Sequence, residues 1–402
     1  MNAPANRPAG FADVGYAEAI GRARDLVPAL RERAGAAETA RGMLKETEAD
    51  LHRLGLFRFL QPRRYGGMEL DYVSFVDVPA EIGRGCASTA WNVANLGIHH
   101  FMLALYDERA QDEVWGANPD ALIASGIAYP QGRGRKVDGG FVISGRWNFS
   151  SGVDVSEWNM LAAMIRDGDK VTDYRMCLLH KSDYEVVDDW HVLGMRSTGS
   201  KTVVANEVFV PAYRALCTLD ARGGDGFPGA KANPNPMYRV PMSSIGAHGI
   251  GGAAAGNAQA ALELTIDAVK ARSTSYTASK MRDFQAVQLR IGAASAKIDA
   301  ARLLMRSDCI EGKEIAVQGV IPDALTKLRF KRNLAYGVQL CTEAVDLLHG
   351  MAGANGIYDS YPIQRIFRDA HALAGHFSFS FDAQVSAWGL AALGGEAGSP
   401  TL

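Results

Sequence analysis

One run of apolar residues in the last third of the chain constrains the fold more than any other feature. Its members are spaced alternately three and four residues apart, and they are Phe284, Val287, Ile291, Ala294, Ile298, Ala301 and Met305. Because this spacing keeps every side chain on one side of a helix, it predicts a straight apolar seam against another helix. With further helical patterns at about 322–350 and 362–392, residues 242–402 are predicted to form a four-helix bundle.

The N-terminal part of the chain also has helical patterning. AEAIGRARDLVPALRERA and ETARGMLKETEADLHRLGLF carry charges on one face, whereas WNVANLGIHHFMLALY is apolar nearly throughout. The first two patterns are typical of surface helices and the third of a buried helix. We therefore expect a helical domain over residues 13–120, preceded by a flexible tail over residues 1–12.

Residues 121–220 have the texture of a β-sheet. Short runs such as FVISGRWNF, YRMCLLH and KTVVANEVFVP are separated by turn signals that include DGG and STGS. Alternation in FVISGRWNF places Phe141, Ile143, Trp147 and Phe149 on one face of a strand. We predict an antiparallel middle domain, followed over residues 221–241 by a linker or flap rich in Gly, Pro and Asn.

The composition excludes several kinds of partner. With 42 basic and 44 acidic residues the net charge is −2, which offers no field for nucleic acid or anionic lipid. The chain has neither a signal-peptide pattern nor an apolar run of membrane-span length, so we expect a cytoplasmic protein that binds a small molecule. We interpret the cysteines as buried thiols in a reducing compartment, because no CxxC pair occurs among them. They are Cys86, Cys177, Cys217, Cys309 and Cys341.

Common sequence motifs of catalysis are missing. HExxH, P-loop and GxSxG strings do not occur, and the histidines have no carboxylate at ligand spacing, so no metal site is expected. A GxGxxA string at Gly249, Gly251 and Ala254 suggests a dinucleotide fold. Because no strand precedes it and no βαβ unit follows, we predict that its small residues serve close helix packing instead.

Three polar stretches are candidates for a binding site. RWNFSSG ends a predicted strand with Ser150, Ser151 and Gly152, which could hold a flat heterocycle or form an ordinary polar turn. In ARSTSYTASKMRDFQ, Arg272 could bind a phosphate or be a solvated surface charge. The third stretch, GMRSTGSKTVVANEVFVP, couples a polar turn to a strand and is weak alone.

Together these stretches resemble the acyl-CoA dehydrogenase superfamily over nearly the whole chain. RWNFSSG corresponds to its Trp-containing flavin loop, GMRSTGSKTVVANEVFVP to its strand that ends in Val-Pro, and AVDLLHGMAGANGIYDSYPIQRIFRDA to its segment that ends in Arg-Asp. The resemblance implies an α+β fold with an N-terminal helical domain, a middle antiparallel β domain and a C-terminal four-helix bundle. It also implies a bound flavin and a homotetramer in which one subunit contributes to its neighbour's flavin site.

The chain departs from the dehydrogenases at His376. Many of them have a Glu-Gly pair after the Arg-Asp helix, and the Glu removes the α-proton of the thioester, whereas this chain has Gly375-His376-Phe377. This text is more similar to the oxygenase components of two-component flavin monooxygenases, such as phenol and hydroxyphenylacetate hydroxylases and dibenzothiophene oxygenases. The matching residues are Trp91, His99, Ser125-Gly126-Ile127, Asn148-Phe149-Ser150, Arg272 and His376-Phe377.

This resemblance implies hydroxylation of an aromatic or heteroaromatic substrate by O2 and FADH2 or FMNH2, through a flavin C4a-hydroperoxide, with a separate NAD(P)H:flavin reductase. The implied flavin contacts are Trp91, Ser125, Gly126, Ile127, Asn148, Phe149, Ser150, Arg272, Ala354, Asn355, His376 and Phe377. His376 would stabilise and protonate the reduced oxygen, and Ser150 would hold flavin N5 through its hydroxyl or backbone. His99 would accept a phenolic proton.

Several alternatives stay open at this point. The chain could be an acyl-CoA dehydrogenase with a relocated base, an N- or S-oxygenase of the same fold, or a helical scaffold or flavin-storage protein. A buried structural histidine is as compatible with His99 as a substrate contact, and it is favoured for His100 and His371. The sequence leaves the substrate open, and also the choice between FMN and FAD.

Overall fold

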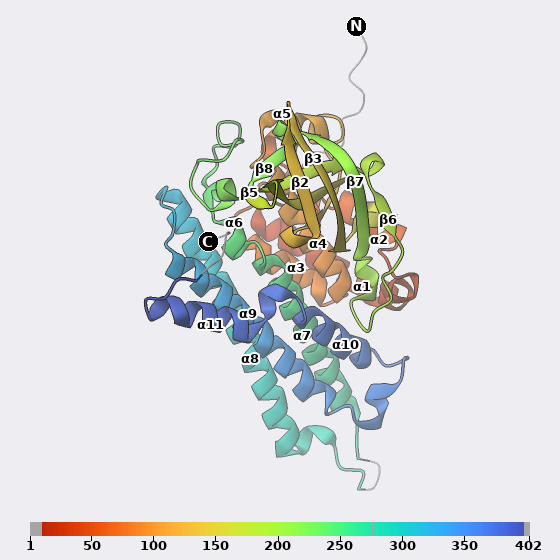
Figure 1. Cartoon of the computed structure of the whole chain (residues 1–402). Helices are drawn as coiled ribbons and strands as arrows, with labels where there is room; N and C mark the ends of the chain where they lie inside the picture. The colour runs from red at the N-terminus through yellow and green to blue at the C-terminus, as the bar shows by residue number, and fades with distance from the viewer. Residues whose placement is uncertain (1–9, 275–276, 398–402) are drawn as a thin grey trace.

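The computed structural model of the chain describes residues 10–274 and 277–397. Its N-terminal part is helical, and the helices are α1 (Tyr16–Ala40), α2 (Lys45–Arg53), α3 (Ser74–Gly83), α4 (Ala87–Leu103) and α5 (Glu108–Gln111). As expected from its apolar sequence, α4 is buried on nearly all sides. Figure 1 shows α3 and α4 between the sheet and the C-terminal helices, so α4 joins the two halves of the molecule.

The middle of the chain forms one eight-stranded sheet. Its strands are β1 (Ile123–Gly126), β2 (Gly132–Val137), β3 (Gly140–Ser150), β4 (Trp158–Asp167), β5 (Lys170–His180), β6 (Glu185–Val187), β7 (Lys201–Pro211) and β8 (Ala215–Cys217). The order is β6-β7-β3-β2-β4-β5-β8, with β1 beside β4. The predicted antiparallel sheet is wrong in one respect, because β1 and β2 both pair with β4 in parallel. β1 pairs with the first half of β4 and β2 with the second half, and both run in the same direction as β4.

Strand β3 departs from simple alternation close to its end. Phe141, Ile143 and Trp147 are buried, as predicted from their common face. The prediction is wrong for Phe149, which is 67% exposed. The pairing register with β7 shifts between Trp147 and Ser150, and Phe149 adopts a positive φ of 66°. A bulge of this kind adds one unpaired residue and turns the following side chains to the other face.

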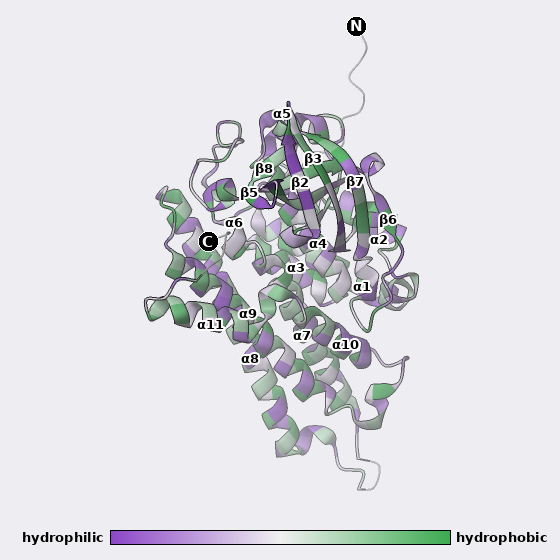
Figure 2. Cartoon of the chain, viewed as in Figure 1, coloured by the Kyte–Doolittle hydropathy of each residue, from purple (hydrophilic) through white to green (hydrophobic). Residues whose placement is uncertain are grey.

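The C-terminal part is helical, with α6 (Met242–Ile245), α7 (His248–Ala271), α8 (Gln285–Val317), α9 (Ala324–His349), α10 (Ile363–Ala374) and α11 (Phe381–Ala392). Helices α7, α8, α9 and α10 pack together, and α11 packs on α9. Hydrophobic and hydrophilic residues alternate along these helices (Figure 2). The predicted seam is buried from Val287 to Met305, although Ile291 is only partly buried. Phe284 precedes α8 and is 41% exposed, so its inclusion in the seam was wrong.

The helix expected over 362–392 is interrupted. Helix α10 ends at Ala374, α11 begins at Phe381, and a short 3-10 turn at Phe377–Phe379 lies between them. His376 is the N-cap of this turn. Gly, Phe and Ser are poorer helix formers than Ala or Leu, which accounts for a break in the stretch GHFSFS. The interruption therefore contains the residue in which the sequence differs from the dehydrogenases.

Small residues pack α7 against α3, as the Gly-rich segment predicts. A Cβ atom on Gly252 would lie 2.3 Å from the carbonyl oxygen of Val76, and one on Gly256 would lie 2.3 Å from that of Ala80. No side chain larger than hydrogen fits at that spacing. The GxGxxA string thus lies on a packed helix, with a mixed sheet elsewhere in the chain.

The segments expected to be mobile are partly packed. Residues 1–9 of the predicted tail lie outside the described residues, but Phe11 is buried and its N–H donates to the Gly66 carbonyl at 2.8 Å. In the predicted flap, Tyr238 stacks on Phe101 with ring centroids 5.5 Å apart. All five cysteines are free thiols, and all but Cys217 are buried. Among the described helices, none is both long and apolar enough to cross a membrane.

Candidate active site

A cavity of about 370 Å³ lies where α4, the sheet and the interruption between α10 and α11 meet. This volume is at the lower end of the range of roughly 300–1,000 Å³ that small-molecule sites occupy. Seven of the predicted site residues line the cavity. They are Trp91, Ser125, Ile127, Asn148, Phe149, His376 and Phe377. Segments far apart in the sequence therefore meet at one small-molecule site.

Aromatic and apolar side chains form uncovered walls of this cavity. Phe149, Phe377 and Ile127 are 67%, 63% and 40% exposed. Trp190 meets Phe149 edge to face with ring centroids 6.1 Å apart. Exposed apolar surface in a concave site marks a place that a ligand covers. Phe149 also holds a left-handed backbone conformation, a strain that in proteins often accompanies a functional site.

His376 presents a hydrogen-bond donor to the cavity. Its Nδ1 accepts from the Ser378 N–H at 3.3 Å, and burial lowers its pKa to about 4. The ring is therefore neutral at pH 7, and because Nδ1 is an acceptor the proton lies on Nε2. Nε2 makes no hydrogen bond with another described residue. Trp91 packs edge to face against the ring at 5.4 Å, which fixes its place.

A chain of hydroxyl groups from Ser151, Ser200 and Thr198 borders the cavity. Trp91 Nε1 donates to Ser151 Oγ at 3.0 Å, Ser151 lies 2.8 Å from Ser200, and Ser200 lies 2.6 Å from Thr198. Thr198 Oγ1 donates to the Met195 carbonyl at 2.9 Å. Since an indole N–H only donates and a carbonyl only accepts, every hydroxyl proton points along the chain. The hydroxyl oxygens are left as acceptors for a ligand N–H.

The structure separates Ser150 from the role predicted for its hydroxyl. Ser150 is fully buried, its Oγ accepts from Asn159 Nδ2 at 3.0 Å, and it does not line the cavity. The bulge at Phe149 turns the next residue, Ser151, toward the cavity instead. Gly126 is also buried, and a Cβ there would lie 2.7 Å from Trp147 Cβ. Any contact of Ser150 or Gly126 with a ligand therefore belongs to the backbone.

His99 and His100 lie on different sides of α4 and have different surroundings. The His99 Nδ1–H donates to the Ile123 carbonyl at 2.5 Å, and burial lowers the pKa of this ring to about 4. His100 stacks on Trp115 and accepts from its Nε1 at 3.1 Å, and burial lowers its pKa to about 3. Neither residue lines the cavity. His371 pairs with Asp346 at 2.8 Å on the surface.

Three predicted flavin contacts lie away from the cavity. Arg272 follows the last residue of α7, and its carbonyl accepts from the Met281 N–H at 3.0 Å. Figure 1 shows this end of α7 at the end of the bundle remote from the sheet. Ala354 and Asn355 are exposed in the turn Gly353–Ile357. The predicted contacts therefore do not all meet at this cavity within the described chain.

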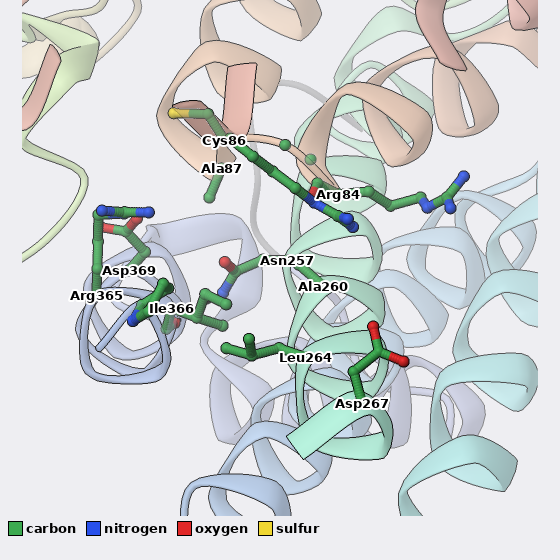
Figure 3. A pocket seen from close by; sticks show the side chains of 14 residues that line it. Arg84, Cys86, Ala87, Asn257, Ala260, Leu264, Asp267, Arg365, Ile366 and Asp369 are labelled. Atoms are coloured by element: carbon green, nitrogen blue, oxygen red, sulfur yellow. Dashed lines mark hydrogen bonds between the residues drawn. The ribbon is translucent and has the colours of Figure 1, made fainter. Parts of the chain in front are cut away.

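A second cavity, of about 150 Å³, lies beside the N-terminus of α4. Figure 3 shows Arg365 and Asp369 of α10 on one wall and Leu264 and Asp267 of α7 on another. Burial raises the pKa of the Asp369 carboxyl to about 6, and its Oδ1 accepts from the Met195 N–H at 2.6 Å. None of the described residues lines both cavities. The two cavities are connected by one hydrogen bond, because Asp369 lines the smaller cavity and its partner Met195 lines the larger one.

Some lining residues were missed from the sequence. Asn95 lies one helical turn after Trp91, and that spacing could have identified it. Trp190 and Gln131 also line the cavity, but no local pattern marks them. These two residues lie in connections between strands, and the tertiary structure of the sheet brings them to the cavity.

The lining fits a flat heterocycle such as a flavin. Exposed aromatic side chains offer apolar faces, the hydroxyl chain offers acceptors for a ring N–H, and His376 offers one donor. Flavin rings present apolar faces and a polar edge of N–H and C=O groups, so this donor set matches them.

Two family models match the chain. The acyl-CoA dehydrogenase N-terminal domain matches residues 23–115, and the acyl-CoA dehydrogenase C-terminal domain matches residues 248–381. Among curated proteins, the flavin-dependent monooxygenase oxygenase subunit HsaA of Rhodococcus jostii is 34% identical over 86% of this chain and 91% of its own. The oxygenase component of the FADH2-dependent resorcinol hydroxylase of a Rhizobium species is 30% identical over 98% of each chain.

Solved structures agree with these matches. The 3-HSA hydroxylase of Rhodococcus sp. RHA1 superposes with a TM-score of 0.91 at 31% identity, covering 96% of this chain and 99% of that one. XiaF from a Streptomyces species, solved with FADH2 and glycerol, has a TM-score of 0.88 at 26% identity. That superposition covers 96% of this chain and 97% of XiaF.

Proposed function

Because the chain belongs to the acyl-CoA dehydrogenase family, and within it to the oxygenase components of flavin-dependent monooxygenases, we propose that its larger cavity hydroxylates an aromatic or heteroaromatic substrate. The chain is an enzyme that uses reduced flavin and O2. As an oxygenase component, it works with a separate reductase. The observation that carries the proposal is a neutral imidazole with a free N–H at position 376, inside a cavity with aromatic walls.

The residues of the cavity have separate tasks in this reaction. Reduced flavin, when bound, supplies two electrons to O2, so that one oxygen atom enters the substrate and the other becomes water. Trp91, Phe149 and Phe377 exclude water from the reacting atoms. The oxygens of Ser151, Ser200 and Thr198 accept the N–H groups of a bound ring.

His376 holds a proton at the reacting oxygen. Its Nε2–H donates a hydrogen bond there, and this stabilises negative charge that develops on the oxygen. The neighbouring rings of Trp91 and Phe377, with centroids 5.4 Å and 4.5 Å from that of His376, keep the imidazole in place. His99, with its pKa near 4, is a weak base. We propose that His99 has a structural role, in which its bond to Ile123 anchors α4 to β1, and that it does not serve as the base.

The dehydrogenase alternative lacks its base in this cavity. None of the described lining residues is a carboxylate, and His376 binds a second proton only near pH 4. Removal of a thioester α-proton needs a stronger base than that. The same observations leave oxygenation of a ring carbon, nitrogen or sulfur chemically open. We propose ring carbon because a relative at 30% identity is a resorcinol hydroxylase.

An isotope experiment tests the proposed function. The full chain is mixed with FAD, NADH, a general flavin reductase and a panel of phenols and indoles under ¹⁸O2. We expect one ¹⁸O atom in the hydroxylated product, measured by mass spectrometry. Product without label, or bleaching of bound FAD by an acyl-CoA in the absence of O2, would overturn the proposal.

We also propose that the site is completed by a second copy of the chain in a homotetramer. Arg272, Ala354 and Asn355 lie outside the cavity in one protomer, although the family resemblance makes them flavin contacts. Apolar residues exposed on the bundle helices offer surface for assembly, namely Leu289, Leu303 and Ile310 on α8. In this arrangement the Arg272 guanidinium of one subunit would meet the flavin phosphate in another.

Replacing Arg272 by alanine is expected to weaken FMN and FAD binding roughly ten- to hundredfold, because a charge-assisted contact to phosphate is lost. Riboflavin, which has no phosphate, should bind the parent and Arg272→Ala equally well, and equilibrium dialysis measures all three. Arg282→Ala, at an exposed arginine that faces Asp283, is a matched control. Equal loss of riboflavin affinity, or a monomeric mass in light scattering, would contradict the shared site.

A further inference from the structure

The larger cavity has no charged side chain in its described lining. Its polar groups are amides and hydroxyls, such as Asn95, Gln131, Asn148 and Ser125. The remaining titratable residue, His376, is neutral at pH 7 because burial holds its pKa near 4. A ligand carboxylate buried here would lack a cation, and an unpaired buried charge is strongly unfavourable.

The nearest cations in the sequence are bound elsewhere. Lys201 follows the lining residue Ser200, but its Nζ lies 3.0 Å from Asp154 and 3.6 Å from Asp188. Arg196 follows Met195, and its Nε donates to the Val192 carbonyl at 2.7 Å. Neither side chain lines the cavity. A carboxylate in the cavity therefore meets no cation among the described lining side chains, and the nearby Lys201 is already paired.

A helix end adds to this discrimination. Ala372, Leu373 and Gly375, at the C-terminus of α10, line the cavity. The last carbonyls of a helix carry partial negative charge, which favours cations and disfavours anions within a turn of that end. The field of α10 and the neutral lining thus act in the same direction.

Asn95 provides an acceptor of fixed orientation. Its Nδ2 donates to the Trp91 carbonyl at 2.9 Å, one turn earlier on α4. This bond fixes the amide with its nitrogen toward the helix, because a carbonyl cannot receive a bond from the amide oxygen. Oδ1 has no hydrogen-bond partner among the described residues. It can accept an O–H or N–H from a substrate and would repel a carboxylate.

We infer that this cavity selects an uncharged aromatic substrate that carries an O–H or N–H donor, and that it rejects the carboxylate analogue of the same ring. The inference rests on the proposed function, which makes this cavity the substrate site, but it concerns the binding of the substrate and not its oxygenation. Asn95 is the residue that we assign to orienting the substrate donor.

Ligands matched in size test this selectivity. 4-Hydroxyphenylacetamide and 4-hydroxyphenylacetate differ by a neutral amide against a carboxylate, and their dissociation constants are measured by equilibrium dialysis at pH 7.5. The full chain is used with reduced FAD under anaerobic conditions, so that no turnover occurs. We expect the amide to bind at least roughly tenfold tighter than the carboxylate. Equal affinity, tighter binding of the carboxylate, or no binding of either ligand would overturn the inference.

Two variants separate charge from hydrogen bonding. Asn95→Lys should reduce or invert the preference for the amide, because it places a cation in the cavity. Asn95→Leu should weaken both ligands and leave their order unchanged, because only the acceptor is lost. If Asn95→Leu binds the amide as tightly as the parent does, Asn95 has no orienting role. Selective binding of the amide, together with no ¹⁸O in any product of the isotope experiment, would overturn the proposed function and support this inference.

Discussion

Replacing His376 by alanine is expected to lower the yield of hydroxylated product per O2 consumed at least tenfold, with a matching rise in H2O2. Alanine removes the Nε2–H donor and opens space for water beside the Trp91 ring, which packs on the imidazole at 5.4 Å. Oxidation of the reduced flavin itself should change less, because this step needs no donor from the chain. Product, H2O2 and O2 measured in the same reaction give the coupling directly.

Two further variants and a pH series sharpen this prediction. His376→Gln retains an N–H donor and should recover part of the coupling, whereas His371→Ala, at a histidine on the surface, should leave it unchanged. Because the pKa of His376 is lowered to about 4, its ring stays neutral from pH 6 to 9. Coupling that depends on this residue should be constant there and change only as the pH falls toward 4. A transition near pH 7 that disappears in His376→Ala would contradict the neutral form.

Helical periodicity predicted the bundle better than it predicted where helices end. The seam from Val287 to Met305 is buried because a spacing of three and four residues determines one face of α8 whatever its neighbours are. Phe284 fits the same spacing but precedes the helix, since periodicity carries no information about the N-cap. The interruption after Ala374 was missed for a similar reason. The stretch GHFSFS has low helix propensity, but periodicity does not mark where one helix ends and the next begins.

The site shows the same division between local pattern and tertiary structure. Motifs predicted that Trp91, Asn148 and His376 belong together, and the cavity brings them together. They could not predict that a bulge at Phe149 buries the Ser150 hydroxyl and turns Ser151 toward the cavity, since bulges depend on pairing with β7. Trp190 could not be predicted at all, because no local pattern shows that the segment between β6 and β7 reaches the cavity.

Replacing Gly252 by alanine is expected to destabilise the protein by about 3 kcal/mol or more, near the upper end of overpacking effects. The new Cβ would lie 2.3 Å from the Val76 carbonyl oxygen and 3.0 Å from the Val76 carbonyl carbon. Both are backbone atoms of α3, so the clash cannot be relieved by a side-chain rotation and the two helices must separate. Urea unfolding monitored by circular dichroism measures the loss as a lower midpoint.

The sign of this effect distinguishes packing from helix propensity. Alanine normally stabilises a helix relative to glycine by about 1 kcal/mol, so propensity alone predicts a higher midpoint for Gly252→Ala. Gly292→Ala is the matched control, because this glycine lies within α8 and a Cβ there meets nothing within 4 Å. It should raise the midpoint. If both variants raise it, α3 and α7 are not packed as closely as we describe, and α4 would lose the support that holds Trp91 at the cavity.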